Sequence, residues 1–285
     1  MAWIIIMLYG AALGIILFYG LFQFTLISHA RKYKRKSETT QHPVLNIEQP
    51  QNVPFVTVQL PVYNEYYVVE RLIDAVASLH YPKERLEIQV LDDSTDDTYD
   101  IIKRKVKEIQ QSEINIKHLY RNDRIGYKAG ALQYGLNQAE GEFIAIFDAD
   151  FVPEPDFLIN TLPQFDNEQV GMVQTRWGHI NENYSLLTRM QAFGLNAHFK
   201  IEQTGRYHGG RFLNFNGTGG VWRKSCIEDA GGWQHDTIAE DLDLSYRAQL
   251  KGWKFVYLDH VEAPAELPVV ISGLKSQQFR WTKGG

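Results

Sequence analysis

The chain has 285 residues, 44% of them hydrophobic, with a formal net charge of −5 and a sequence pI of about 6.0. This length suits one large α/β domain with a small additional element better than two independent domains. The mildly acidic balance argues against a broadly basic surface, so we exclude nucleic acid as a partner.

The first 30 residues predict a transmembrane helix. Residues 1–28 contain no Asp, Glu, Lys or Arg, and at ~1.5 Å per residue they can cross the ~30 Å hydrocarbon core of a bilayer with some excess for tilt. A cleaved signal peptide is the alternative reading. No basic residues precede the apolar run and no convincing small-residue cleavage site follows it. We therefore expect a retained membrane anchor.

Residues 31–53 predict a basic juxtamembrane segment followed by a linker. Residues 31–36 include five Lys or Arg, a bias that places the following chain on the cytoplasmic side of the membrane. The rest of the segment is polar and has no sustained period. The single cysteine, Cys226, cannot form an internal disulfide, which suits a reducing compartment.

Strands and helices alternate from residue 54, and we assign residues 54–285 to one domain. Apolar runs predict strands over residues 55–60, 86–91, 114–119 and 143–147. Helical spacing predicts helices over residues 68–79, 97–110 and 128–139. This alternation is typical of an α/β fold with a mostly parallel sheet and helices on both faces. Beyond residue 150 we expect helices over residues 155–165 and 184–204 and a strand over residues 170–175.

Asp92 and Asp93 lie where the second predicted strand ends. Ordinary helix capping explains part of this acidic segment, because Ser94, Thr95 or Asp96 could accept hydrogen bonds from the first amides of the next helix. Asp92 and Asp93 lie upstream of the cap, at the strand end where open α/β sheets bind ligands. We expect them to contact a nucleotide.

Asp148 and Asp150 follow the fourth predicted strand directly. In an extended segment, residues at i and i+2 share one side, so both carboxylates could reach one divalent cation. An acidic loop without function is the alternative, since Asp is common where strands end. The position at the carboxyl end of a parallel strand favours a metal and nucleotide site.

Glu240 and Asp241 open another predicted helix and have two readings. Charge stabilisation of a helix start would explain both residues. A sugar transferase also needs a general base for its acceptor hydroxyl, and a carboxylate at the mouth of the site could serve.

Residues 277–281 combine polar and aromatic side chains. Arg280 could hold diphosphate oxygens at two atoms, and the indole of Trp281 could stack on a sugar. A membrane-interface helix is the alternative reading, and it is compatible with the functional one.

Two glycine-containing segments could approach a ligand through their backbone. Residues 124–130 could present cationic groups and a helix N-terminus to phosphate, although a helix start is sufficient explanation. Residues 215–222 include three glycines, which permit close approach, although a tight turn explains them equally well.

In this order, Asp93, Asp148-x-Asp150, Asp241 and Gln277-x-x-Arg280-Trp281 resemble the D, DxD, D, QxxRW signature of membrane family 2 glycosyltransferases. The cellulose-synthase-like branch fits best. Segments 61–65, 90–95, 216–223 and 250–255 particularly resemble glucomannan 4-β-mannosyltransferases and β-glucan synthases. The resemblance covers the chain from about Val53 to its end.

The resemblance implies a GT-A fold and an inverting single displacement that moves glucose or mannose from a nucleotide diphosphate sugar, UDP-glucose or GDP-mannose, to a polysaccharide acceptor. The bond formed would be a β-glycosidic one. The implied roles are nucleotide-sugar binding by Tyr63, Glu65, Asp92, Asp93, Lys128, Asp148 and Arg280, metal binding (Mg²⁺ or Mn²⁺) by Asp148 and Asp150, catalysis by Asp241 with Glu240, and acceptor binding by Gly217, Thr218, Gln277 and Trp281.

Two other functions stay open. A glycolipid synthase that adds one sugar to a membrane lipid shares the same signature, and an inactive nucleotide-sugar binder would result from truncation. The chain reaches Gly285 soon after its last motif without a second apolar span, so we expect it to be truncated at its C-terminus.

Overall fold

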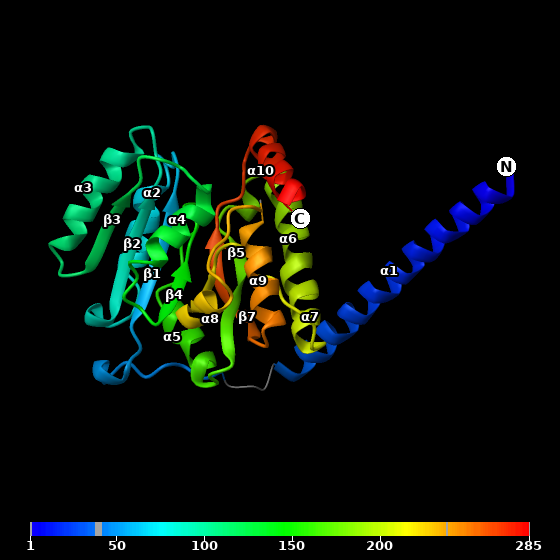
Figure 1. The fold of residues 1–285 in the computed structure, drawn as a ribbon, viewed down its shortest axis with the longest axis horizontal. Helices are drawn as coiled ribbons and strands as arrows, with labels where there is room; N and C mark the ends of the chain where they lie inside the picture. The colour runs from blue at the N-terminus through cyan, green and yellow to red at the C-terminus, as the bar shows by residue number, and fades with distance from the viewer. Residues whose placement is uncertain (1, 38–41, 238, 285) are drawn as a thin grey trace.

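A computed structural model of the chain describes residues 2–37, 42–237 and 239–284. Helix α1 (Ala2–Ser37) projects from the body of the protein, with the N-terminus at its far tip (Figure 1). Its stretch Ala2–Lys34 is long and apolar enough to cross a membrane. The helix predicted over residues 1–30 is therefore present. It also runs through the basic segment, because Lys and Arg are good helix formers. Residues 38–41 of the predicted linker, and Gly285 at the end of the predicted domain, lie outside the described residues.

One seven-stranded sheet forms the centre of the domain, in the order β3-β2-β1-β4-β6-β5-β7. The strands are β1 (Val56–Val62), β2 (Leu86–Asp92), β3 (Asn115–Tyr120), β4 (Phe143–Ile146), β5 (Val170–His179), β6 (Gly220–Arg223) and β7 (Lys254–Ala265). Neighbouring strands are parallel except for β6, which runs antiparallel to both β4 and β5. The predicted mostly parallel sheet is confirmed, whereas β6 and β7 were not predicted.

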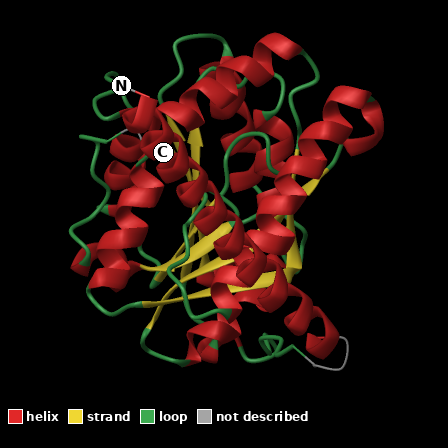
Figure 2. Ribbon diagram, turned by 90° about the vertical axis from the view of Figure 1, so that its right-hand side faces the viewer, coloured by secondary structure: helices red, strands yellow, loops and turns green. Residues whose placement is uncertain are grey.

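Helices cover both faces of this sheet, as the sequence predicts (Figure 2). They are α2 (Val69–Ala77), α3 (Thr98–Gln110), α4 (Tyr127–Leu136), α5 (Phe157–Thr161), α6 (Leu186–Ala197), α7 (Thr204–His208), α8 (Lys224–Asp229), α9 (Glu240–Leu250) and α10 (Ile271–Gly284). Apolar side chains of α2, α3 and α5 form one core with the sheet. Those of α4, α8 and α9 form the second core on the other face.

The region predicted as one helix over residues 184–204 consists of several pieces. Helix α6 passes into a π-helix, η5 (His198–Gln203), which continues into α7. Short 3-10 helices complete the chain: η1 (Pro50–Asn52), η2 (Lys83–Arg85), η3 (Leu162–Asp166) and η4 (Glu182–Tyr184). A π-helix widens the backbone by one residue per turn and is frequent at functional sites.

Helix α1 is anchored to the domain through α7 and the segment after it. Leu26 is fully buried, and a Cβ at Gly205 would lie only 2.5 Å from the Leu26 carbonyl oxygen, so the two helices approach closely at a glycine. Arg211 donates a hydrogen bond to the Thr25 hydroxyl (2.9 Å). Its guanidinium lies 4.1 Å from the ring centroid of Phe22.

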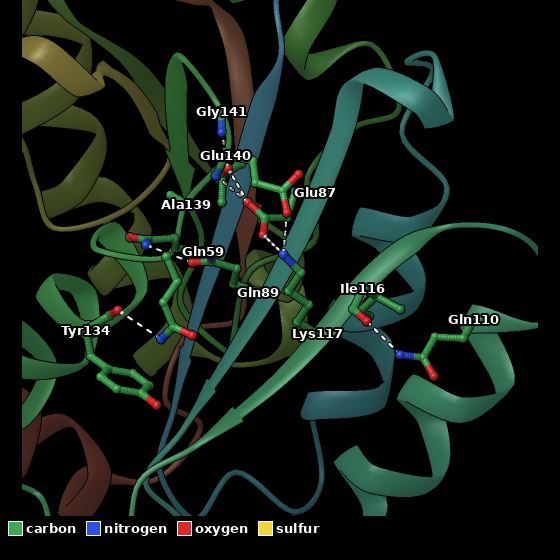
Figure 3. A network of polar contacts seen from close by, with 12 residues as sticks. Gln59, Glu87, Gln89, Gln110, Ile116, Lys117, Tyr134, Ala139, Glu140 and Gly141 are labelled. Carbon is green, nitrogen blue, oxygen red and sulfur yellow. Dashed lines mark hydrogen bonds and ion pairs between the residues drawn. The ribbon is translucent and has the colours of Figure 1, made fainter.

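The sheet face beneath α4 carries buried polar side chains (Figure 3). Lys117 pairs with the fully buried Glu87 at 2.7 Å, and Gln59 donates to Gln89 at 3.0 Å. Burial opposes the charge of Glu87, but hydrogen bonds led by that from Lys117 lower its pKa overall. A Cβ at Gly135 of α4 would lie 2.6 Å from the Gln59 amide nitrogen. The pairs Lys117–Glu87 and Gln59–Gln89, called here the polar ladder, and Gly135 therefore fix α4 closely against β1 and β2.

Candidate functional site

The two carboxylates that follow β4 lie close together, although not in the extended segment that the sequence predicts. The backbone turns here, since the Phe151 amide donates to the Asp148 carbonyl at 3.0 Å. Burial, and then the charge of Asp148, raise the pKa of Asp150 to about 7. Both carboxylates therefore belong to one electrostatic site, in which the charge of Asp148 disfavours ionisation of Asp150.

Lys128 brings a positive charge to these carboxylates from the start of α4. Its Nζ donates to Asp148 Oδ1 (2.5 Å) and to the carbonyl oxygen of Gly217 (2.9 Å). Burial opposes the charge of Lys128, but Asp148 and then Glu240 outweigh it and raise the lysine pKa. Gly126, with a φ of 75°, ends the preceding loop and starts the helix.

The turn at residues 216–220, called here the glycine turn, connects these groups. Gly217 has a φ of 77°, which favours glycine. A Cβ on it would lie 3.2 Å from Asp241 Oδ2 and 3.4 Å from Lys128 Nζ. The buried Thr218 hydroxyl accepts a hydrogen bond from the Asp148 amide at 2.9 Å. The glycine turn therefore lies between the DxD carboxylates and the start of α9.

Asp241 and Glu240 open α9 beside this turn. Asp241 Oδ1 accepts from the Leu242 amide at 2.8 Å, so the helix-start reading holds for one of its oxygens, while Oδ2 lies toward Gly217. Burial is the largest cause that raises the pKa of Asp241, and Asp148 adds to it. Burial likewise raises the pKa of Glu240. Raised carboxylate pKa values are suited to accepting a proton.

The side chains at the ends of β1 and β2 form a second group. The Arg124 guanidinium lies 3.2 Å from the Tyr63 ring centroid. Arg121 binds Asp93 at two atoms, with Nε–Oδ1 at 2.7 Å and Nη2–Oδ2 at 2.5 Å. Burial, and then the charge of Asp148, raise the pKa of Glu65, so its carboxyl group belongs to the same electrostatic site as the DxD carboxylates.

Asp92 lies inside the protein, in contrast to the predicted contact with a nucleotide. It is fully buried, its Oδ2 pairs with His118 Nε2 at 2.7 Å, and its Oδ1 accepts from the Ser94 amide at 2.8 Å. Both oxygens have protein partners, so Asp92 orients the strand end that carries Asp93. The predicted cap is confirmed at Asp96, which accepts from the Thr98 amide at 3.0 Å.

Helix α10 carries the last motif to the same region. The ring centroid of Trp281 lies 6.3 Å from that of Trp177, whose Nε1 donates to the Thr218 carbonyl oxygen at 3.4 Å. The charge of Arg280 partly opposes the raised pKa of Glu65, so α10 contributes to the electrostatics of the DxD region. Gln277 is half-buried and precedes Trp281 by one helical turn.

The structure also reveals residues that sequence reasoning missed. Arg121 follows directly after β3, and the rule that strand ends bind ligands could have found it. Trp177 and His198, which reach the glycine turn, give no such signal, because their partners are distant in sequence.

Asp148 and Asp150 suit a hard divalent cation by the chemistry of their oxygens. Within residues 2–37, 42–237 and 239–284, no group of three or more His, Cys, Asp or Glu could hold a metal ion. Two carboxylates fit a Mg²⁺-type ion only if phosphate oxygens of a substrate and water complete its coordination. The donor set therefore matches a metal that arrives with a diphosphate.

Comparisons with known proteins identify the family of the chain. The family model described as "Glycosyltransferase like family 2" matches residues 53–284. "Probable glucomannan 4-beta-mannosyltransferase 4" of Oryza sativa subsp. japonica is 47% identical over 236 residues. "Glucomannan 4-beta-mannosyltransferase 1" of the same organism is 44% identical over 236 residues. Each match covers 81% of this chain, but only 43% and 45% of the respective relative.

Solved structures share the fold. The mannosyltransferase PcManGT from Pyrobaculum calidifontis, in complex with GDP-Man and Mn²⁺, superposes with a TM-score of 0.69 at 23% identity, over 96% of this chain and 72% of that chain. S. aureus TarS in complex with UDP-GlcNAc gives a TM-score of 0.57 at 19% identity, over 76% and 59%. These likenesses confirm the predicted GT-A architecture. The chain belongs to glycosyltransferase family 2.

Proposed function

We propose that this chain transfers a hexose from a nucleotide diphosphate sugar to a hydroxyl of a polysaccharide, with inversion and formation of a β-glycosidic bond. The meeting of Asp148, Lys128 and Asp241 at the glycine turn carries this proposal. It sets a phosphate-binding cation and a metal-binding carboxylate on one side of the turn and a candidate base on the other. A single displacement needs that arrangement.

The donor would lie along the ends of β1, β2 and β4. We assign Tyr63, Glu65 and Asp93 to the nucleotide, and Lys128 and Arg280 to the diphosphate, whose developing charge cations stabilise. Asp92 has a positioning role in this proposal, because it is fully buried.

Asp148 and Asp150 would hold Mg²⁺ or Mn²⁺. When bound, such an ion supplies Lewis-acid stabilisation of the leaving diphosphate. Mn²⁺ in the PcManGT complex, which has the same fold, supports this assignment. Lys128, already paired with Asp148 at 2.5 Å, orients that carboxylate before the donor binds.

Asp241 would take the proton of the acceptor hydroxyl, with Glu240 beside it. Its raised pKa makes it a better proton acceptor than an ordinary exposed Asp. The acceptor would lie against Gly217, Gln277 and Trp281, with Thr218 holding the turn from inside. The indole of Trp281, which is 41% exposed, suits stacking on a sugar face.

GDP-mannose is our first choice of donor, since the rice relatives are glucomannan mannosyltransferases, and UDP-glucose is the second. The apolar helix α1 favours one alternative, in which a membrane lipid receives a single sugar. By the positive-inside rule we place the domain on the cytoplasmic side of the membrane, because Lys and Arg follow the apolar stretch.

Product analysis tests this function. The full chain, purified in detergent, would be incubated with Mn²⁺, a mannan or glucan oligosaccharide or membrane lipid, and radiolabelled GDP-mannose or UDP-glucose. We expect β-linked sugar on the oligosaccharide. Label found only on lipid would establish the alternative. Donor binding without any transfer would make the chain a nucleotide-sugar binder.

A further inference from the structure

The π-helix η5 brings His198 to the glycine turn. His198 is the first residue of η5, and its side chain is 30% exposed. Its Nε2 lies 3.1 Å from Asn216 Oδ1, and its Nδ1 lies 3.0 Å from Glu202 Oε2. A histidine from a segment outside the signature motifs is thus bonded to the first residue of the turn that faces Asp241.

Both partners of the ring are hydrogen-bond acceptors. Asn216 offers an amide oxygen to Nε2, and Glu202 offers a carboxylate oxygen to Nδ1. The Asn216 amide nitrogen lies toward the Asn214 carbonyl oxygen at 3.4 Å, which agrees with this orientation. Arg206 also pairs with Glu202 at 2.9 Å. The hydrogen bond from His198 is the largest cause that lowers the pKa of Glu202 to about 2.

Asn216 fixes the start of the glycine turn through two hydrogen bonds. The backbone amide of Asn216 donates to Oε1 of the buried Gln174 at 2.9 Å. Both the backbone and the side chain of Asn216 are therefore hydrogen-bonded. The next residue, Gly217, receives Lys128 Nζ at its carbonyl and faces Asp241. A change in Asn216 would therefore move the short segment that separates the candidate base from the donor groups.

We propose that His198 is a positioning residue for sugar transfer: its Nε2 proton holds Asn216 and so fixes the glycine turn against Asp241. This role rests on the proposed glycosyl transfer. His198 touches neither Asp148 nor Asp241 in the described contacts, so it acts through Asn216. Misplacement by about 1 Å at a distant positioning residue can cost about 10²-fold in rate.

A matched pair of variants separates the two hydrogen bonds. The Gln side chain places a donor near the position of His Nε2, so His198→Gln keeps the bond to Asn216. The shorter Asn side chain places its donor near Nδ1, so His198→Asn keeps only the bond to Glu202. Transfer by His198→Asn should fall roughly tenfold or more, whereas His198→Gln should stay within about threefold of the unmodified chain. The KM for the donor should change little in both.

Two controls accompany the pair. His80 makes a similar carboxylate contact at the surface, with Nδ1 at 2.8 Å from Asp156, so His80→Asn should leave transfer unchanged. Melting temperatures of both His198 variants test for general loss of stability. Independently of activity, ¹⁵N NMR of the unmodified chain should find a proton on Nε2 of His198.

Each remaining outcome overturns the inference. Equal transfer by both variants, whether near that of the unmodified chain or equally reduced, would deny a special role to the Nε2 bond. A bare Nε2 in the NMR spectrum would exclude it as a donor. If the unmodified chain binds donor but transfers no sugar, the proposed function fails and this role fails with it. If the unmodified chain transfers sugar and both His198 variants transfer it equally well, the positioning role fails while the proposed function stands.

Discussion

The two sides of the candidate site differ in how their carboxylates are held. On the donor side, Arg121 binds both oxygens of Asp93, and Lys128 pairs with Asp148. On the other side, Asp241 bonds a backbone amide through one oxygen, and its second oxygen lies toward Gly217. Asp93 and Asp148 on the donor side are thus each paired with a cation before any ligand binds, whereas Asp241 bonds a backbone amide. In the proposed function, donor binding and proton transfer are separate tasks on the two sides of the glycine turn.

The substitution Asp241→Asn tests the proposed catalytic side of the site and should have the largest effect. If Asp241 is the base, transfer should fall by about 10²–10⁴-fold, while donor affinity should change little, because the donor-side ion pairs remain. Steady-state transfer rates and titration calorimetry with the donor measure the two effects. A loss of donor affinity as large as the loss of rate would show that the two sides are not separate.

The substitution Asp150→Ala tests metal binding on the donor side. Loss of one carboxylate should abolish the increase in donor affinity that Mn²⁺ produces, because too few ligands remain for the ion. Glu154→Ala is the control, since Glu154 is exposed and lies four residues away. Donor titrations with Mn²⁺ and with EDTA provide the measurement. Equal affinities of the variant and the unmodified chain in Mn²⁺ would refute the metal assignment.

Gly217→Ala tests the turn between the sides. The new methyl group would lie 3.2 Å from Asp241 Oδ2, at a φ of 77°, and transfer should fall roughly tenfold from strain of about 1–2 kcal/mol. Gly210→Ala introduces similar strain at a φ of 64° with open space around it, so it should leave transfer unchanged. Similar losses in both variants would remove the specific role of the turn.

The pH dependence of metal binding tests the raised pKa of Asp150 on the donor side. The pKa of Asp150 is raised to about 7, so a proton competes with the cation below that pH. Affinity for Mn²⁺ with bound donor should fall by up to about tenfold per pH unit below this value. In the metal-free protein the folded state holds a proton that the unfolded chain releases. The free energy of unfolding should therefore decrease as pH rises from 3.8 toward about 7. Asp150→Asn should abolish the pH dependence of metal affinity and weaken the trend in unfolding free energy, to which the raised pKa values of Glu65, Glu240 and Asp241 also contribute.

The smallest expected effect concerns the packing of α4, the helix that carries Lys128. Gly135→Ala would place a Cβ 2.6 Å from Gln59 in the polar ladder and should cost about 1–3 kcal/mol of unfolding free energy. Gly194→Ala in α6 has no atom within 4 Å, so it should be neutral or stabilise by about 0.5–1 kcal/mol. Urea denaturation measures both, and equal values would contradict the tight seating of α4.

The sequence predicted the donor half of the fold better than the other half. Strand β4 is a continuous apolar run, and apolar residues alternate with other residues along most of β1 and β2. The carboxylates after β2 and β4 follow from the strand ends. Strand β6 has four residues beside a glycine turn, and β7 carries a register irregularity opposite Thr175 and Arg176, so neither has a clear period. Arg121 and His198 act through partners brought together only by folding. The burial of Asp92 could not be predicted, because its partner His118 lies on a neighbouring strand.

The most direct test is a structure of the full chain with the donor, Mn²⁺ and an acceptor oligosaccharide, with the metal located by anomalous scattering. We predict Mn²⁺ between Asp148, Asp150 and the diphosphate. Asp241 should lie beside the acceptor hydroxyl, on the face of the anomeric carbon opposite the leaving group. A metal bound elsewhere, or Asp241 on the same face as the diphosphate, would contradict the division of the site at the glycine turn.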